Sequence, residues 1–100
     1  HAHTVIVDLR EREELLRDGL IEGSVHVPRG LLEFAADPAS PYHHPKIVPE
    51  ARIILHCASG GRSALAAQTL KHMGYPQVAH LDGGFTAWKT QGHPFKMPET

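Results

Sequence analysis

The sequence predicts an α/β fold, in which a parallel sheet is covered by helices on both faces. Short β-branched apolar runs alternate along the chain with longer segments of helical character, several of which end at a glycine. With 41% hydrophobic and 21% charged residues, the chain has the composition of an ordinary globular protein, and its 100 residues suffice for one domain. We therefore expect residues 1–100 to form a single domain, and we exclude disordered and disulfide-scaffold classes.

The first half of the chain contains two predicted strands and two predicted helices. Residues 5–7 are a β-branched run typical of a buried strand, and residues 11–18 are typical of a short polar surface helix. Residues 23–28 combine a turn, a brief strand and a proline exit, and residues 31–36 predict another short helix. Four prolines make residues 37–49 irregular, and this segment is long enough to be a lid or a binding loop.

The second half of the chain continues the same alternation. Residues 52–56 form a clear strand, and the alanine-rich residues 63–73 form the best-defined helix, with large apolar side chains roughly on one face. Residues 78–81 predict a further strand, residues 82–84 a tight turn and residues 85–91 a last helix. Strands that alternate with helices in this way favour a parallel sheet.

Charge and hydropathy exclude several classes of partner. Ten basic and eleven acidic side chains give a net charge of −1, without the basic stripe that nucleic-acid binding needs. No apolar run exceeds four residues, which is far too short to cross a membrane. The first residues lack the basic and apolar regions of a signal peptide. We therefore expect a cytoplasmic protein that binds neither nucleic acid nor membrane.

Cys57 is the single cysteine, so it has no partner for an internal disulfide or for a multi-cysteine zinc site. It is either a buried small hydrophobe or a reactive thiol, and its surroundings favour the second interpretation. A strand ends at Cys57, and a helix begins near Ser63, so backbone N–H groups and the helix dipole meet at the sulfur. Gly60 and Gly61 permit the unusual backbone angles that such a tight loop needs.

A thiol in this position is expected to be acidic. Sites of this kind lower a cysteine pKa from about 8.5 to roughly 3.5–7.5, and a shift of about two units already leaves most of the thiol ionised at neutral pH. Arg62 adds a fixed cation at the end of the loop, and Ser63 offers a hydroxyl or amide donor at the start of the helix.

Four motifs, in order along the chain, resemble the rhodanese (sulfurtransferase) family in its single-domain form. Residues 57–63 resemble the Cys-x-x-Gly-x-Arg-Ser active-site loop of that family. Residues 7–14 resemble its opening strand and helix, residues 23–30 its Gly-His-Ile-Pro-Gly-Ala signature, and residues 81–88 its Gly-Gly-x-x-x-Trp element. The resemblance covers the chain from about residue 5 to residue 95.

The resemblance implies a five-stranded parallel sheet and a two-step sulfur transfer without a metal or organic cofactor. A thiolate at Cys57 would take the outer sulfur of a small donor, either thiosulfate or a persulfide, and become a persulfide. An acceptor such as cyanide, a thiol or a thioredoxin-like protein would then remove that sulfur. The site residues expected on this basis are Cys57 as the catalytic group, Ala58, Ser59, Gly60, Gly61, Arg62 and Ser63 around the substrate, and Asp8 and Arg10 in support.

Two positions depart from the family pattern. Thiosulfate-preferring members often carry a cation directly after the cysteine, whereas this chain has Ala58, which leaves Arg62 as the only cation of the loop and weakens the expectation of a thiosulfate preference. In the second motif Ser24 replaces the usual His and Arg29 replaces a small residue. Arg29 either extends a positive rim of the site or is an exposed turn residue.

Two other functions compete with sulfur transfer. The first is that of a phosphatase or arsenate-reductase relative. Phosphatases that share the rhodanese fold place five residues between cysteine and arginine, but only four separate Cys57 from Arg62, so the loop suits a sulfur atom better than a phosphate. A regulatory module or a sulfur carrier loaded by a partner enzyme is the other alternative. The retained cysteine, glycines and arginine argue against an inactive copy.

Nearby residues also have plain structural interpretations. Asp8 is expected to hydrogen-bond either the loop or Arg10 in a structural role. His56 precedes Cys57 directly, and neighbours in a strand point to opposite faces, so we expect a packed or half-exposed histidine rather than a general base. Phe85 and Trp88 are predicted to be core residues of the last helix.

Overall fold

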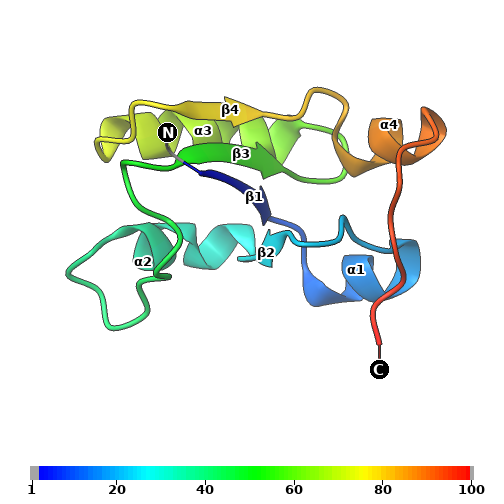
Figure 1. Cartoon of the computed structure of the whole chain (residues 1–100), viewed down its shortest axis with the longest axis horizontal. Coiled ribbons are helices and arrows are strands. Elements are labelled where there is room, and N and C mark those ends of the chain that lie inside the picture. Colours follow the sequence, from blue (N-terminus) through cyan, green and yellow to red (C-terminus); the bar gives the residue numbers. More distant parts are fainter. Residues whose placement is uncertain (1–2, 100) are drawn as a thin grey trace.

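In the computed structural model, which describes residues 3–99, four parallel strands form one sheet in the order β2-β1-β3-β4 (Figure 1). The strands are β1 (Thr4–Asp8), β2 (Val25–His26), β3 (Arg52–His56) and β4 (Val78–His80). The helices are α1 (Arg12–Asp18), α2 (Leu32–Ala36), α3 (Gly61–His72) and α4 (Gly84–Thr90), with a 3₁₀ turn, η1 (Arg29–Leu31), before α2. The predicted α/β fold with a parallel sheet is therefore confirmed.

The fifth strand implied by the family resemblance is absent from the described part of the chain. Beyond the four strands, residues 3–99 add one isolated antiparallel bridge, between Leu20 and Lys96. Pro94 and Pro98 lie two residues to either side of Lys96. Because proline has no N–H to donate to a ladder, this segment forms a single bridge rather than a strand.

The main hydrophobic core lies on one face of the sheet. Side chains alternate between faces along a strand, so Ile53 and Leu55 of β3 point toward this core, where they join Leu32 of α2 and Leu70 of α3. His56 points to the opposite face and stacks on Phe85 of α4, with ring centroids 6.2 Å apart. Helices thus cover both faces.

Trp88 departs from the prediction that it belongs to the core. Phe85 is buried as expected, but Trp88 is only half-buried. Its indole N–H donates to the carbonyl of Pro94 at 2.7 Å, and its ring lies 4.7 Å from that of His93. Trp88 therefore holds the chain that comes after α4, while Phe85 packs against His56 of the sheet.

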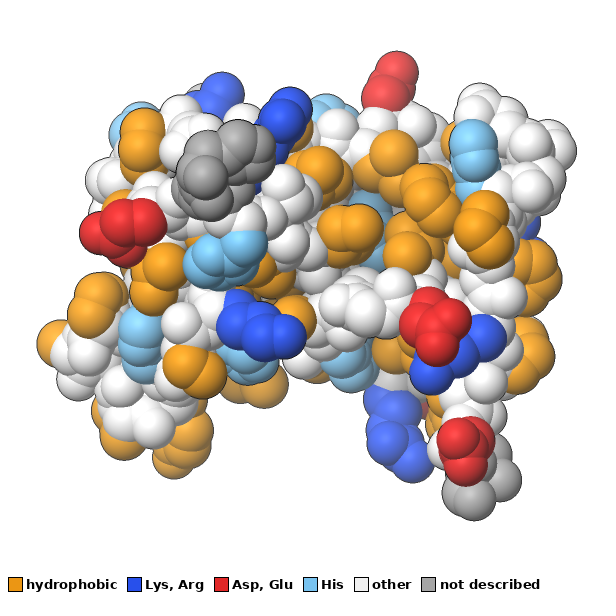
Figure 2. All heavy atoms as spheres, viewed as in Figure 1, with side chains coloured by type: hydrophobic (Ala, Val, Ile, Leu, Met, Phe, Trp, Pro, Cys, Tyr) orange, Lys and Arg blue, Asp and Glu red, His pale blue; other side chains and the backbone are white. Residues whose placement is uncertain are grey.

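Residues 37–49 contain turns and neither helix nor strand, as their prolines predicted. The hydroxyl of Tyr75 lies 2.7 Å from the carbonyl of Ala36 and 2.9 Å from that of Ile47, and so fixes the two ends of this loop. Tyr42 and Phe34 remain exposed beside an apolar groove between the loop and α2, and Figure 2 shows hydrophobic side chains gathered there at lower left.

None of the helices within residues 3–99 is both long and apolar enough to cross a membrane. His1 and Ala2, which carry part of the expectation that no signal peptide is present, lie outside the described residues.

Candidate active site

A four-residue loop leads from the carboxyl end of β3 into α3, at the carboxyl edge of the sheet (Figure 1). Cys57 is the first residue of this loop. Its side chain is buried, with 1% of the residue exposed. The loop places Gly60 and Ser63 beside the sulfur. The Gly60 N–H donates to the Cys57 Sγ at 3.2 Å, and the Sγ lies 3.6 Å from the Ser63 Oγ.

The loop makes the Cys57 thiol acidic. Burial raises the pKa of Cys57, but hydrogen bonds from the backbone and hydroxyl of Ser63 and from the backbones of Gly60 and Ser59 lower it by more. The net pKa lies below the ordinary cysteine value, as the sequence predicted. Because these donors are fixed by the chain, they stabilise negative charge on sulfur without first having to reorient.

Gly60 and Gly61 differ in conformation. Gly60 has a φ of +113°, a left-handed value that side chains disfavour, and it turns the chain so that its N–H faces the sulfur. Gly61 is the first residue of α3 and does not have a positive φ. Of the two glycines, the prediction of an unusual backbone conformation thus applies to Gly60 alone. Because Gly61 already belongs to α3, the helix begins two residues before the predicted Ser63.

The start of α4 holds the outer side of this loop. The N–H groups of Phe85 and Thr86 donate to the carbonyls of Cys57 and Ala58 at 2.8 and 3.0 Å. A Cβ placed on Gly84 would lie 2.5 Å from both of those carbonyl oxygens, so α4 can approach this closely only with glycine there. The tight turn predicted over residues 82–84 therefore positions the cysteine loop.

Arg62 is bound to a carboxylate that the sequence analysis did not single out. Its two terminal nitrogens donate to the two oxygens of Glu14 in α1, both at 2.8 Å. The hydrogen bond from Arg62 lowers the pKa of Glu14 to about 2, although partial burial opposes the shift. Glu14 in turn raises the pKa of Arg62, and charge at Cys57 contributes to that rise. The positive charge of Arg62 is thus offset by the Glu14 carboxylate beside it.

The Glu14–Arg62 pair predicts an acid-sensitive contribution to stability. Because the folded pKa of Glu14 lies below its ordinary 4.5, the contribution is complete above about pH 4.5 and is lost as the pH falls toward 2. The Arg62 side chain is 38% exposed, so solvent limits the contribution of the pair to about 1 kcal/mol or less. Urea unfolding at pH 5 and pH 3 should show a larger loss for the wild type than for Glu14→Gln. Equal losses would contradict this role of the pair.

Asp8 and Arg10 form a buried ion pair beneath the loop rather than a contact with the loop itself. The Arg10 guanidinium donates to both Asp8 oxygens, at 3.0 and 2.7 Å, and to the carbonyl of Gly19 at 2.8 Å. It also lies over the ring of Phe85, 4.1 Å from the ring centroid. The pair therefore connects the ends of β1, α1 and α4, which are the elements that surround the cysteine loop.

His56 is fully buried, and its ring nitrogens make no hydrogen bond within residues 3–99; Nε2 lies 3.6 Å from an Asp8 oxygen. Burial lowers the pKa of His56, against the opposing charge of Asp8, so the ring is held neutral. Because its side chain faces away from the core side on which Cys57 lies, it is a packed histidine, as expected.

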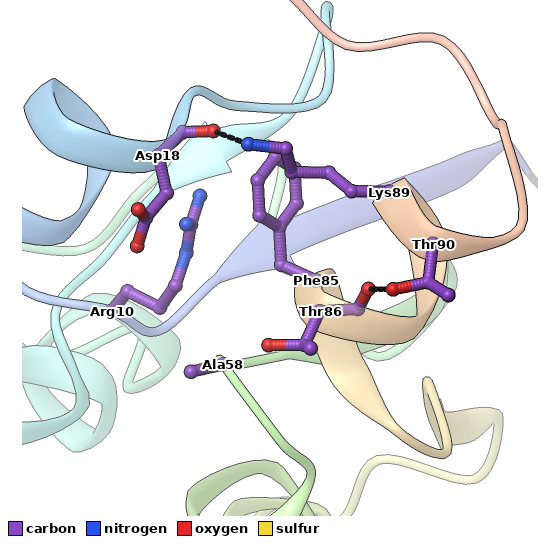
Figure 3. A pocket seen from close by; sticks show the side chains of 7 residues that line it. All are labelled: Arg10, Asp18, Ala58, Phe85, Thr86, Lys89 and Thr90. Carbon is purple, nitrogen blue, oxygen red and sulfur yellow. Dashed lines mark hydrogen bonds between the residues drawn. The ribbon is translucent and has the colours of Figure 1, made fainter.

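A pocket of about 280 Å³ adjoins the loop at Ala58 (Figure 3). Its walls combine the guanidinium of Arg10, the ring of Phe85 and the ammonium of Lys89, which donates to the carbonyl of Asp18 at 2.8 Å. Cys57 is not among the lining residues, so the pocket flanks the loop rather than opening onto the sulfur.

The remaining predicted positions divide between the loop and its surroundings. Ser59 is exposed, and its backbone N–H helps to lower the Cys57 pKa. Arg29 forms an ion pair with Glu33 at 2.9 Å and lies 3.4 Å from the hydroxyl of Thr69, so it joins α2 and α3 and does not extend the rim of the cysteine loop.

Sequence reasoning missed three contributors to the site. Glu14 and Gly84 both fall within motifs that were recognised, but a motif does not state which residue touches which. His80, whose ring Nδ1 lies 3.0 Å from the Ser63 hydroxyl, has no sequence signal: its role depends on the register in which β4 pairs with β3.

The chain is similar to several known proteins. A model of the rhodanese-like domain matches residues 1–91. A protein of Allochromatium vinosum named sulfurtransferase is 30% identical over 95 residues, which cover 95% of this chain and 80% of that protein. A solved structure from Rhodopseudomonas palustris, described as a protein of unknown function and a possible tyrosine phosphatase, is 48% identical with a TM-score of 0.90, over 93% of this chain and 70% of that one. A rhodanese-related protein of Thermoplasma volcanium is 27% identical with a TM-score of 0.76, over 95% and 85% of the two chains.

Proposed function

The chain belongs to the rhodanese-like domain family, and from this premise we propose that it is a sulfurtransferase that carries sulfane sulfur as a persulfide on Cys57. The observation that carries the proposal is the buried Cys57 sulfur, which accepts the Gly60 N–H inside the motif loop and has a lowered pKa. A thiol with a lowered pKa, whose thiolate is surrounded by fixed hydrogen-bond donors, is the arrangement that sulfur transfer needs in both of its steps.

In the first step the Cys57 thiolate attacks the outer sulfur of the donor. A new S–S bond forms at Cys57 while the donor's own bond to that sulfur breaks, and the leaving group departs with the bonding pair, as sulfite from thiosulfate or as a thiolate from a persulfide. In the second step a nucleophile such as cyanide or a thiol attacks the terminal sulfur, and Cys57 leaves as a thiolate. No net oxidation occurs.

The loop supports both steps by holding anionic sulfur. The backbone N–H groups of Ser59, Gly60 and Ser63, which lower the Cys57 pKa, point where negative charge rests before and after each transfer. The Glu14 carboxylate, bound to Arg62 through two hydrogen bonds of 2.8 Å, offsets the attraction of the Arg62 cation for a dianion. With Ala58 beside Cys57, this favours a persulfide donor over thiosulfate.

A steady-state assay with cyanide as the acceptor tests the proposal through the thiocyanate produced. We expect turnover with both donors, a higher kcat/KM for a low-molecular-weight persulfide than for thiosulfate, and parallel double-reciprocal lines, because the donor's product leaves before the acceptor binds. Absence of turnover with free donors, together with persulfide loading by a partner enzyme, would instead indicate a sulfur carrier or regulatory module.

The phosphatase alternative is tested in the same preparation. The Rhodopseudomonas palustris protein, which is 48% identical to this chain, is described as a possible tyrosine phosphatase. With four residues between Cys57 and Arg62, and with Arg62 occupied by Glu14, we expect no hydrolysis of para-nitrophenyl phosphate. Hydrolysis that disappears in Cys57→Ser would overturn the sulfurtransferase proposal in favour of a phosphatase.

A further inference from the structure

A buried hydroxyl lies between the Cys57 sulfur and a histidine on the neighbouring strand. The Ser63 Oγ is 3.6 Å from the Cys57 Sγ and 3.0 Å from the Nδ1 of His80, and Ser63 itself is 0% exposed. His80 ends β4, and its pairing with Leu55 of β3 places it beside the strand that leads to the cysteine. The three side chains therefore form a continuous chain of hydrogen-bonding atoms.

The Ser63 hydroxyl has one proton and three neighbours. It can donate to the carbonyl of Gly60, 3.2 Å away, to the Nδ1 of His80, or to an ionised Cys57 sulfur. With a protonated thiol, Cys57 donates to Ser63 and the hydroxyl is free to donate to an unprotonated Nδ1. With a thiolate, the favourable order is reversed, since Ser63 then donates to sulfur and accepts from a protonated Nδ1.

We propose that Ser63 and His80 form a proton relay that removes the thiol proton of Cys57. The Cys57 proton passes to the Ser63 Oγ as the hydroxyl proton passes to the Nδ1 of His80, which leaves a thiolate and an imidazolium separated by one hydroxyl. No bond other than these S–H, O–H and N–H bonds is made or broken. His80 is a positioning residue in this scheme, because it acts on sulfur only through Ser63.

The relay leads from a closed site toward solvent. Cys57 is 1% exposed, so its proton needs a path out of the loop. His80 is half-buried and lines a surface pocket together with Ala64, Gln68 and Lys71 of α3. This pocket, in which Lys71 is the charged side chain, gives the His80 ring access to water.

His56, the histidine next to Cys57 in sequence, is not placed for this task. Its side chain points to the opposite face of the sheet, and neither of its ring nitrogens has a hydrogen-bond partner. A buried imidazole with no link to the sulfur or to water has no route by which to exchange the thiol proton. His80, although it lies 23 positions after Cys57 in the sequence, does have that route.

The test measures the rate of Cys57 alkylation by iodoacetamide from pH 5 to pH 10, a readout that needs no sulfur donor. We compare the wild type with His80→Ala, His80→Asn, Ser63→Ala and the double variant His80→Ala/Ser63→Ala. The role of the relay in catalysis rests on the proposed function, but the relay itself is judged here even if sulfur transfer fails. Urea unfolding verifies that each variant is folded.

Loss of one hydrogen-bonded partner of the thiolate corresponds to a change of about three- to tenfold in the ionisation constant of the thiol, and therefore in the alkylation rate at neutral pH. At neutral pH we expect His80→Ala to slow alkylation by that factor and to move the midpoint of its pH profile upward, with rates that converge with those of the wild type at high pH. His80→Asn should remain as slow, since an amide keeps a hydrogen bond to Ser63 but takes up no proton. In the Ser63→Ala background, the His80 change should have no further effect.

Three results would overturn the relay. The first is an unchanged pH profile in His80→Ala. The second is full rescue by His80→Asn, which would indicate a merely structural hydrogen bond. The third is an undiminished effect of His80→Ala in the Ser63→Ala background, which would indicate that His80 acts directly on the sulfur. If His80→Ala does not fold, the comparison of His80→Asn with the wild type decides between the relay and a structural role.

Discussion

Replacing Cys57 with serine should abolish thiocyanate formation while the protein stays folded. The hydroxyl that replaces the thiol is far less acidic and cannot form a persulfide, so we expect turnover to fall by ~10³-fold or more, to the uncatalysed rate. The change is small and lies in a loop, where a serine oxygen can still accept the N–H of Gly60. Stability should therefore change by no more than about 1–2 kcal/mol.

Turnover and urea unfolding of Cys57→Ser, measured on the same preparation, separate the two effects. A folded but inactive variant is the expected outcome. Full activity in the variant would exclude Cys57 as the nucleophile, and with it the proposed function, because residues 1–100 contain no second cysteine.

Replacing Gly84 with alanine should push the start of α4 away from the cysteine loop and so displace that loop. The new Cβ would lie 2.5 Å from the carbonyl oxygens of Cys57 and Ala58, and Gly84 has a φ of +60°, which disfavours any side chain. Because the atoms in the way are backbone atoms, they cannot move aside as the end of a flexible side chain could. We expect a loss of at least about 2 kcal/mol in the free energy of unfolding. We also expect a higher Cys57 pKa in alkylation, because the N–H donors of the loop shift away from the sulfur.

Gly30→Ala is the matched control, since it makes the same chemical change at a glycine without a positive φ and with no heavy atom within 4 Å of the added Cβ. The control should behave like the wild type in unfolding, alkylation and turnover. If Gly84→Ala also behaves like the wild type, α4 does not hold the loop in the way that its hydrogen bonds to Cys57 and Ala58 indicate.

The sequence predicted most of the fold because local patterns coincide with the elements. The β-branched runs and glycine stops mark the strands and helices to within about two residues. Trp88 was assigned to the core wrongly because its burial depends on the path of the chain after α4: the segment with Pro94 returns beside it and accepts its N–H. The fifth strand was implied by the resemblance alone, and the prolines around Lys96 leave only one bridge there.

Within the site, the loop that surrounds Cys57 was predictable because the residues that shape it are adjacent in sequence. Contacts between elements were not predictable. Glu14 reaches Arg62 from a position 48 residues earlier, and His80 reaches Ser63 from a strand 17 residues later. Such pairs depend on strand order and on the packing of α1 and α3 around the sheet, which no local pattern encodes.

The measurement that tests the central claim most directly is the intact mass of the protein after incubation with thiosulfate or with a low-molecular-weight persulfide. We predict a gain of one sulfur atom, which cyanide or a thiol removes and which Cys57→Ser does not acquire. The persulfide should load the protein more completely than thiosulfate, because Ala58 adds no charge and the Glu14 carboxylate offsets the Arg62 cation. No gain in mass from either donor would contradict the proposal that Cys57 accepts sulfur from small donors.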